Sequence, residues 1–361
     1  MSKTVAIIGG GFLGAELAKA LDDKAEVILI EQNSHFVNAP AMIRALVQPG
    51  ILDQALVPYD RLLTRGKVIS ARAEHVDGTG VTLADGRHIA ADYIVVATGS
   101  TNAPMFKPAT GGITGLREMS SKVHAQIKAA TRIAIVGAGA VGTELAGEIA
   151  HHMPDKQVTL VSSDPALFPM MPTKLGTKLL TKLRAMGVDV ILGAKAENLQ
   201  SLTEPYAGTL RLANGREMAA DLIIPAIGSR ANSDLLATLP GAEKSTTNRF
   251  KTDGWMRPSS LPNVFAAGDA ADMGDAMTVV AISRQAPWLA KTLTALLAGK
   301  DLESLKPFGP WQKGKTPLLV PLGPKRGASF LVLFTAGGFL TAMLKGRHVF
   351  IGKYRKLLRQ G

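Results

Sequence analysis

The chain has 361 residues, 46% of them hydrophobic and 19% charged, which is typical of a folded protein with room for two compact domains. It contains no cysteine, and this excludes disulfides, thiolate zinc sites, iron–sulfur clusters and dithiol redox chemistry. Most of the net charge of +12 lies in residues 304–361, which hold 11 Lys and Arg and no Asp or Glu. We therefore expect this end to meet an anionic partner, a membrane or a nucleic acid.

The first pattern along the chain is an apolar strand at residues 5–8 that leads into a glycine-rich turn and a helix. The turn carries Gly9, Gly11 and Gly14 at the G-x-G-x-x-G spacing that is typical of a dinucleotide-binding loop in this context. The first glycine permits the tight turn, the second lets the backbone approach a pyrophosphate, and the third lets the helix pack on the strand. Glu31 ends the next strand, where its carboxylate can accept hydrogen bonds from an adenosine ribose. The alternative is a structural turn with a surface glutamate.

The rest of the first hundred residues predicts a β-meander and a buried strand. Alternating stretches around Asp85-Gly86 indicate the meander, and an apolar run ends at Thr98 and Gly99. Arg44 is a candidate contact for FAD phosphates, with a surface helix residue as the alternative. Lys107 follows in a Pro-rich segment, where it can reach a flavin edge as a proton donor or charge partner, although the pattern favours a solvated loop lysine.

The same pattern then recurs. A strand at residues 133–136 leads into Gly137, Gly139 and Gly142, and a second hairpin signal is followed by an apolar strand that ends at Gly228. The chain is therefore predicted to be two copies of one dinucleotide-binding fold, with the boundary near residues 104–113.

Two side chains of the second copy are candidates for nicotinamide nucleotide binding. Ser162 ends the strand that corresponds to the one before Glu31, and it neither repels nor attracts a ribose 2′-phosphate, so we expect modest discrimination between NADH and NADPH. An ordinary strand end is the alternative. Glu144 lies early in the helix after the glycine loop and can hold the nicotinamide carboxamide; its alternative role is a favourable acid near a helix N-terminus.

After the second copy, residues 263–267 predict a strand that returns to the first domain. Gly268 and Asp269 follow it, and this carboxylate is a candidate for a flavin ribityl hydroxyl; an unremarkable Gly-Asp turn is the alternative. Thr278 can cap a helix that faces the flavin, or a helix elsewhere. No metal site is expected.

The C-terminal segment combines apolar and basic residues. Residues 328–344 carry no charge, but 17 residues are at the lower limit for a spanning helix, and Gly337-Gly338 favours a strand, a turn and a short helix. In the basic stretch that follows, four apolar residues share one helical face, which favours a helix lying in a lipid interface: Phe350, Tyr354, Leu357 and Leu358. The alternative is a terminal helix docked on the protein with a solvated basic face.

Together these motifs resemble the apoptosis-inducing-factor-like flavoproteins, with the type II NADH dehydrogenases as wider relatives. The resemblance rests on both glycine loops, Ala97-Thr98-Gly99-Ser100-Thr101, Phe265–Asp269 and the tail from Leu318 to Arg359. It implies FAD in the first domain, NADH or NADPH in the second, and a ubiquinone-like quinone reduced at the membrane. It also implies that Phe350 lies near the quinone route and that Glu144 and Lys107 occupy functional positions.

The expected fold is therefore α/β, with two Rossmann-like domains and a small C-terminal α+β element. The FAD-binding domain is expected at 1–108 and 240–303, the NAD(P)H-binding domain at 109–239, and the membrane- and quinone-side element at 304–361. The expected function is that of a cytoplasmic, peripheral membrane NAD(P)H:quinone oxidoreductase in which hydride passes to FAD, with no nucleic acid partner; a homodimer is compatible with this. Two alternatives stay open: a reductase of a small iron–sulfur protein, and a nucleic-acid-binding or signalling flavoprotein that uses the basic tail.

Overall fold

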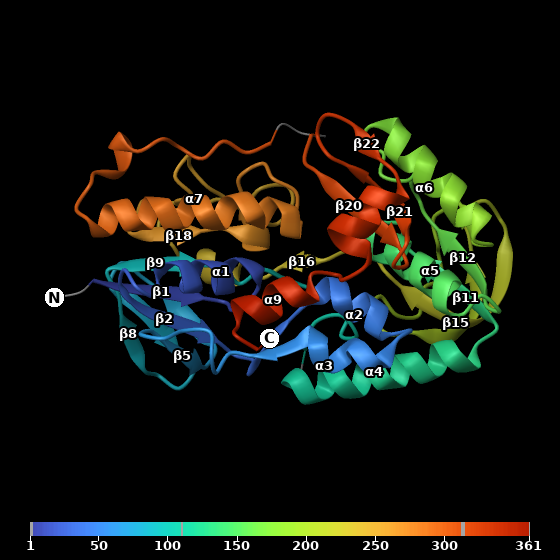
Figure 1. Ribbon diagram of the computed structural model, residues 1–361, viewed down its shortest axis with the longest axis horizontal. Coiled ribbons are helices and arrows are strands. Elements are labelled where there is room, and N and C mark those ends of the chain that lie inside the picture. The colour runs from blue at the N-terminus through green and yellow to red at the C-terminus, as the bar shows by residue number, and fades with distance from the viewer. Residues whose placement is uncertain (1–2, 110, 312–314, 361) are drawn as a thin grey trace.

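The computed structural model describes residues 3–109, 111–311 and 315–360, and it contains two α/β units side by side (Figure 1). The first unit has a parallel sheet of order β18-β9-β1-β2-β5. Its strands are β1 (Thr4–Ile8), β2 (Glu26–Glu31), β5 (Lys67–Ser70), β9 (Tyr93–Val96) and β18 (Val264–Ala266). Val264 pairs with Ile94, so the chain returns to this sheet after the second unit, as expected.

Both faces of the first sheet are covered, which explains why its strands are almost continuously apolar. Val5 and Ile7 of β1 pack with α1 (Phe12–Leu21) and α7 (Val279–Leu297). The neighbouring Ala6 and Ile8 point to the other face, against the predicted meander of β6 (Ala73–Val76), β7 (Gly80–Leu83) and β8 (His88–Ala90).

The second unit repeats the arrangement with the sheet order β13-β12-β11-β15-β14. Its strands are β11 (Arg132–Val136), β12 (Gln157–Val161), β13 (Asp189–Ile191), β14 (Tyr206–Arg211) and β15 (Glu217–Pro225). Helices α4 (Gly112–Ala129), α5 (Ala140–His152) and α6 (Thr173–Ala185) contribute to the core of this unit. The two connections between the units pair as a short ribbon of β10 (Ser100–Thr101) and β16 (Arg230–Ala231). The residue limits of the domains stay a prediction.

Shorter elements complete the first unit. Strands β3 (His35–Val37) and β4 (Leu56–Pro58) pair with each other, and α2 (Ala39–Ala45) and α3 (Leu52–Ala55) lie between them in sequence. A second small pair joins β17 (Phe250–Lys251) to β19 (Ala271–Asp272).

The C-terminal residues form a separate small layer. It consists of β20 (Leu318–Leu322), β21 (Arg326–Phe330), β22 (Thr335–Ala336), α8 (Gly338–Thr341), a π-helical turn (Ala342–Gly346) and α9 (Ile351–Leu357). The predicted succession of strand, turn and short helix is thus confirmed. Within the described residues, every helix is too short or too polar to cross a membrane. The layer docks closely on α5: a Cβ on Gly147 would lie 2.6 Å from the Cα of Leu322, so only glycine fits there.

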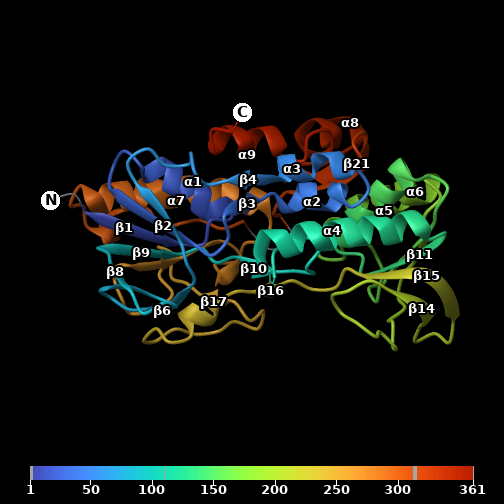
Figure 2. The same cartoon turned by 90° about the horizontal axis from the view of Figure 1, so that it is seen from below.

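Helix α9 is docked on the protein, beside α1 and α3, on the same side as α8 (Figure 2). Tyr354 and Leu358 are fully buried, and Phe350 and Leu357 are partly buried against the same core. The Tyr354 ring lies 4.9 Å from Phe36 in a stacked arrangement, and its hydroxyl donates to a carboxylate oxygen of Glu16 at 2.8 Å. The prediction that this helix lies in a lipid interface is therefore wrong, because its apolar face already packs in the first unit.

Candidate active site

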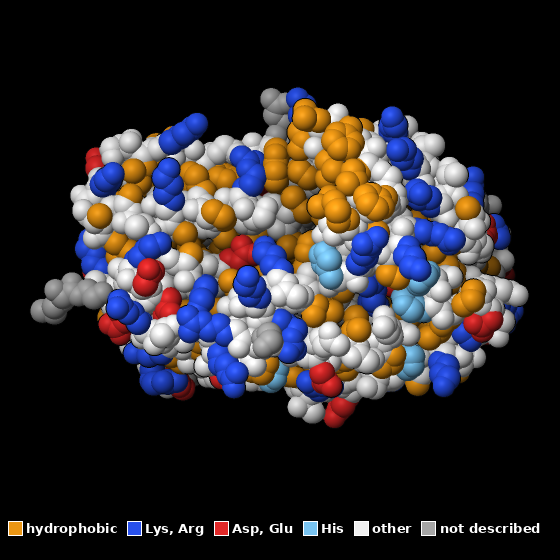
Figure 3. Space-filling view, in the orientation of Figure 1, with side chains coloured by type: hydrophobic (Ala, Val, Ile, Leu, Met, Phe, Trp, Pro, Cys, Tyr) orange, Lys and Arg blue, Asp and Glu red, His pale blue; other side chains and the backbone are white. Residues whose placement is uncertain are grey.

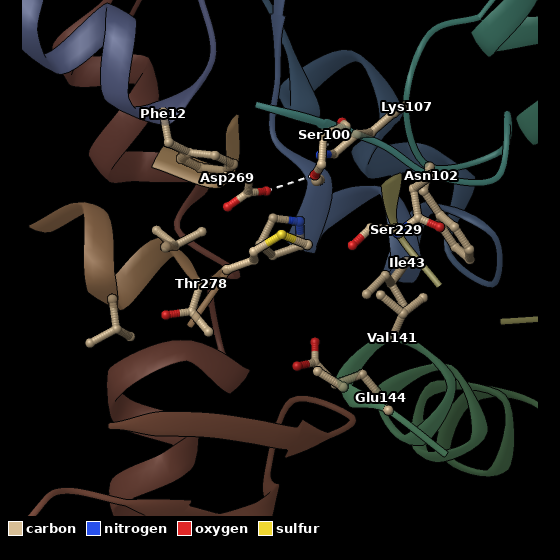
Figure 4. A pocket seen from close by; sticks show the side chains of 18 of the residues that line it. Phe12, Ile43, Ser100, Asn102, Lys107, Val141, Glu144, Ser229, Asp269 and Thr278 are labelled. Carbon is tan, nitrogen blue, oxygen red and sulfur yellow. Dashed lines mark hydrogen bonds between the residues drawn. The ribbon is translucent and has the colours of Figure 1, made fainter. Parts of the chain in front are cut away.

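A pocket of about 360 Å³ lies where the two units and the C-terminal layer meet (Figure 4). The first unit lines it with Phe12, Ser100, Lys107, Asp269 and Thr278, and the second unit with Gly139, Val141, Glu144 and Gly228. The C-terminal layer adds Leu318, Leu319, Lys345 and Phe350. Candidates from all three predicted segments therefore share one chamber.

The first glycine loop has the geometry that a dinucleotide site needs. Gly9 has φ +99°, and a Cβ there would lie 2.5 Å from the carbonyl oxygen of Ala97. A Cβ on Gly14 would lie only 1.8 Å from the Gly9 carbonyl oxygen, so helix and strand need glycine at both positions. A Cβ on Gly11, in contrast, would meet no atom within 4 Å. The fold itself does not need this glycine, whose backbone borders open space.

The second loop repeats this division. Gly137 has φ +111°, with its Cβ position 2.6 Å from the Ala226 carbonyl oxygen, and a Cβ on Gly142 would lie 1.9 Å from the Gly137 carbonyl oxygen. A Cβ on Gly139 would again meet nothing within 4 Å. Both loops therefore leave room for a pyrophosphate at the middle glycine.

Glu31 lies at the edge of a second pocket, of about 280 Å³, together with Gly9 and Thr98. Its Oε2 accepts the backbone N–H of Gly10 at 2.6 Å and its Oε1 the backbone N–H of Asn33 at 2.8 Å. These bonds hold the carboxylate at the carboxyl end of β2, where an adenosine ribose would lie. The Thr98 hydroxyl donates to the carbonyl of Asn232 and so ties this edge to the link between the units.

Lys107 and Asp269 are joined through Ser100, a residue that the sequence analysis did not select. The Lys107 Nζ donates to the Ser100 carbonyl at 2.7 Å and to its Oγ at 2.9 Å, and this hydroxyl donates to Oδ2 of Asp269 at 2.7 Å. Burial lowers the pKa of Lys107, and the nearby Asp269 opposes that shift. Lys107 is therefore a pocket residue and not a solvated loop lysine. The signal for Ser100 in the sequence was its place directly after Gly99, at the end of the apolar strand. In the structure Gly99 has φ +68° and turns the chain there.

Thr278 is a helix cap, and a role toward a flavin stays a prediction. Its hydroxyl accepts the backbone N–H of Ala281 at 3.1 Å and caps α7, and the residue also lines the pocket. Gly228, with φ +63°, lines the pocket from the second unit. Ser162 is buried, and its Oγ accepts the backbone N–H of Asp164, so it shapes the turn after β12. The discrimination between NADH and NADPH stays a prediction.

Glu144 forms an ion pair that the sequence analysis did not anticipate. Its side chain is 4% exposed, and Oε1 accepts from Nζ of Lys345 at 2.5 Å. Burial raises the pKa of Glu144, while the ammonium of Lys345 opposes the rise. Lys345 also donates to the Leu319 carbonyl at 3.3 Å within the C-terminal layer, and its bond to Glu144 joins that layer to the second unit. The signal in the sequence was that Lys345 is the first charge after the uncharged run of residues 328–344.

Arg44 is a structural residue and not the predicted contact for FAD phosphates. Its side chain is buried, its Nη2 lies 2.8 Å from Oε1 of Glu148, and the same nitrogen donates to the Gly346 carbonyl at 2.5 Å. Its Nη1 donates to the carbonyl of Arg347. The guanidinium is thus used to hold the turn before α9 against α5.

Phe350 lines the pocket and begins α9 in a left-handed conformation with φ +63°, while its place near a quinone route stays a prediction. This conformation is uncommon outside glycine, and it turns the chain from the π-helical turn into α9. The aromatic ring is partly buried against the core of the first unit.

Comparisons with known proteins agree with this geometry. Residues 3–286 match the family model described as pyridine nucleotide-disulphide oxidoreductase. The chain is 31% identical to apoptosis-inducing factor homolog B of Dictyostelium discoideum, over 98% of this chain and 96% of that protein. It is 24% identical to ferroptosis suppressor protein 1 of Taeniopygia guttata, over 99% of this chain and 96% of that protein. A solved ferredoxin reductase of Rhodopseudomonas palustris superposes with a TM-score of 0.65 at 20% identity, over 90% of this chain and 83% of that one. The predicted α/β fold with two dinucleotide-binding units is confirmed.

Proposed function

The chain belongs to the pyridine nucleotide-disulphide oxidoreductase family, and from this premise we propose that it is an NAD(P)H:quinone oxidoreductase. The family uses FAD and NAD(P)H; the disulphide chemistry in its name is excluded here, because the chain has no cysteine. When bound, FAD would take a hydride from NAD(P)H and pass the electrons to a ubiquinone-like acceptor. The observation that carries the proposal is a pocket lined by both nucleotide units and by an apolar wall from the C-terminal layer.

The residues present fit both cofactors. For FAD, the open space at Gly11 would admit the pyrophosphate. Glu31 would accept hydrogen bonds from the ribose, and Asp269 from a ribityl hydroxyl. For NAD(P)H, the space at Gly139 would admit the second pyrophosphate. Glu144, which lies at the pocket between the units, would orient the nicotinamide carboxamide.

The C-terminal side of the pocket, which we call the acceptor wall, is apolar except for Lys345, which pairs with Glu144. Leu318, Leu319 and Phe350 provide the surface against which a quinone ring would pack, and they also exclude water. Reduction of a quinone to a quinol needs protons as well as electrons. Lys107, whose Nζ is fixed by Ser100 and whose pKa is lowered by burial, would hold or deliver a proton at the pocket. The acceptor would be lipid-soluble, so we also propose peripheral attachment to a membrane surface.

The test is steady-state oxidation of NADH and of NADPH by the full-length protein loaded with FAD. A short-chain ubiquinone is compared with a small iron–sulfur protein as acceptor, and duplex DNA is added in a parallel series. We expect quinone turnover that DNA leaves unchanged. Phe350→Ala should lower kcat/KM for quinone about tenfold, a loss of about 1.4 kcal/mol of transition-state stabilisation. Phe339→Ala, which removes an exposed ring outside the pocket, serves as the matched control and should have no effect. Faster turnover with the iron–sulfur protein, or none with quinone, would refute the assignment.

A further inference from the structure

The C-terminal layer carries a concentrated apolar surface. Among the described residues, eight large hydrophobic side chains are exposed, and five of these lie within residues 333–344. We call these five the C-terminal apolar patch: Leu333 (91% exposed), Phe334 (53%), Phe339 (71%), Met343 (46%) and Leu344 (36%). Figure 3 shows hydrophobic side chains gathered on this part of the surface. Isolated exposed hydrophobic residues are ordinary, but a contiguous group of this kind marks a contact surface.

The tip of the patch is held in a costly conformation. Val332 has φ +70°, a left-handed conformation that β-branched residues strongly disfavour. Two backbone hydrogen bonds, from Leu331 to the Phe334 carbonyl and from Leu333 to the Leu331 carbonyl, close the tip at 2.9 Å each. The chain therefore accepts both strain and exposure in order to present Leu333 and Phe334 outward.

Basic residues border the patch on two sides. Helix α6 packs on β21, and Nζ of its Lys178 donates to the carbonyl of Thr335, next to Phe334 in the chain. Lys174 and Lys182 are one turn away on either side, and residues 165–188 contain no acidic residue. On another side, the backbone of Lys325 and Arg326 lies against Gly338, next to Phe339. Figure 3 shows Lys and Arg side chains over α6 beside the apolar surface.

The patch also adjoins the pocket. The π-helical turn exposes Met343 and Leu344, and the next residue, Lys345, lines the pocket and pairs with Glu144. A partner bound to the patch would therefore contact the residue that directly precedes a pocket residue in the chain.

We propose that the C-terminal apolar patch and the basic face of α6 together form a docking surface for a bilayer that contains anionic lipids. Apolar side chains would enter the acyl boundary while the lysines meet lipid phosphates, which is the chemistry of an interfacial membrane contact. The surface deepens the proposed function and rests on it for the lipid-soluble acceptor. The lysines of this surface belong to α6 of the second unit, whereas the sequence analysis had expected the basic residues of α9 to meet the lipid.

The test is co-sedimentation of the full-length protein with phosphatidylcholine vesicles, with and without 30% phosphatidylglycerol. No NADH or quinone is present, so binding is read independently of turnover. We expect binding to the anionic vesicles that weakens with salt. Leu333→Ser/Phe339→Ser should lower the partition coefficient about a hundredfold, and Lys174→Glu/Lys182→Glu about tenfold. Two variants elsewhere serve as controls and should bind like the wild type: Leu202→Ser, which changes an exposed leucine, and Lys122→Glu/Lys128→Glu on α4.

Turnover of a soluble short-chain quinone is measured for each variant in the absence of vesicles, as a check of folding. It should stay at the wild-type rate, because none of the substituted residues lines the pocket. Wild-type protein that fails to bind anionic vesicles overturns the docking proposal. Wild-type binding by Leu333→Ser/Phe339→Ser or by Lys174→Glu/Lys182→Glu overturns it as well. If the vesicles are not bound while the soluble quinone is still reduced, the docking surface fails and the proposed function stands. Vesicle binding without any quinone turnover refutes the function alone.

Discussion

The Glu144–Lys345 ion pair makes a sharp prediction for the substitution Lys345→Met. This change leaves the Glu144 carboxylate buried without its cation, and burial already raises the pKa of that group. A raised pKa means that the native state binds more protons than the unfolded state between the usual carboxyl value and the raised one. The free energy of unfolding therefore falls as pH rises through that window. Without the ammonium the pKa rises further, and the window extends to higher pH.

The magnitude follows from the burial of the pair. Removal of one partner from a buried ion pair costs about 3–5 kcal/mol when the remaining group stays charged. At pH 8 the lower figure corresponds to a fall in Tm of about 4 °C for a protein of this size. At pH 5 the Glu144 carboxyl can take up a proton instead, so the loss should be clearly smaller.

The assay is thermal unfolding of wild type, Lys345→Met and the double variant Glu144→Gln/Lys345→Met at pH 5 and pH 8. The neutral amide needs no cation, so the double variant should regain most of the loss at pH 8. Lys325→Met changes an exposed lysine of the same layer and should leave Tm unchanged. The reasoning is refuted if Lys345→Met loses as much at pH 5 as at pH 8, or if the double variant is no more stable than the single one.

Three further outcomes are expected. Glu31→Ala should weaken FAD binding about tenfold to a hundredfold in a fluorescence titration, because the carboxylate at the ribose position is lost, and unchanged affinity would exclude that role. Gly139→Ala should fold normally but raise KM for NAD(P)H at least about tenfold. Gly142→Ala should instead unfold at lower temperature, because its Cβ meets the carbonyl oxygen of Gly137. Equal effects of the two variants on KM and on Tm would contradict this division. Arg44→Met should cost about 3–5 kcal/mol in stability while the folded fraction binds FAD like the wild type, and a selective loss of FAD affinity would restore the original phosphate prediction.

Local patterns made most of the fold predictable. The two glycine loops announce strand, turn and helix within about fifteen residues each, and the recurrence of the pattern shows the duplication. The shortness of the uncharged run and the glycines at 337 and 338 together favoured strand, turn and short helix over a spanning helix.

Long-range pairing set the limit of prediction. Lys345 reaches Glu144 across 201 positions, and Arg44 reaches Glu148 across 104, so neither partner could be found from spacing. The apolar face of α9 was visible in the sequence, but lipid and a protein core select the same pattern. Helix α9 packs on the protein because Tyr354 contacts the aromatic rings of Phe12 and Phe36, which lie far from it in the chain.

The central claim is that one pocket serves both the nicotinamide nucleotide and the quinone, and anaerobic stopped-flow absorbance of the FAD-loaded protein tests it most directly. Reduction by NADH and reoxidation by a short-chain ubiquinone are followed separately. We predict that Glu144→Gln slows the first half-reaction, that Phe350→Ala slows only the second, and that wild type completes both. Reduced protein that a short-chain ubiquinone leaves unoxidised would contradict the account.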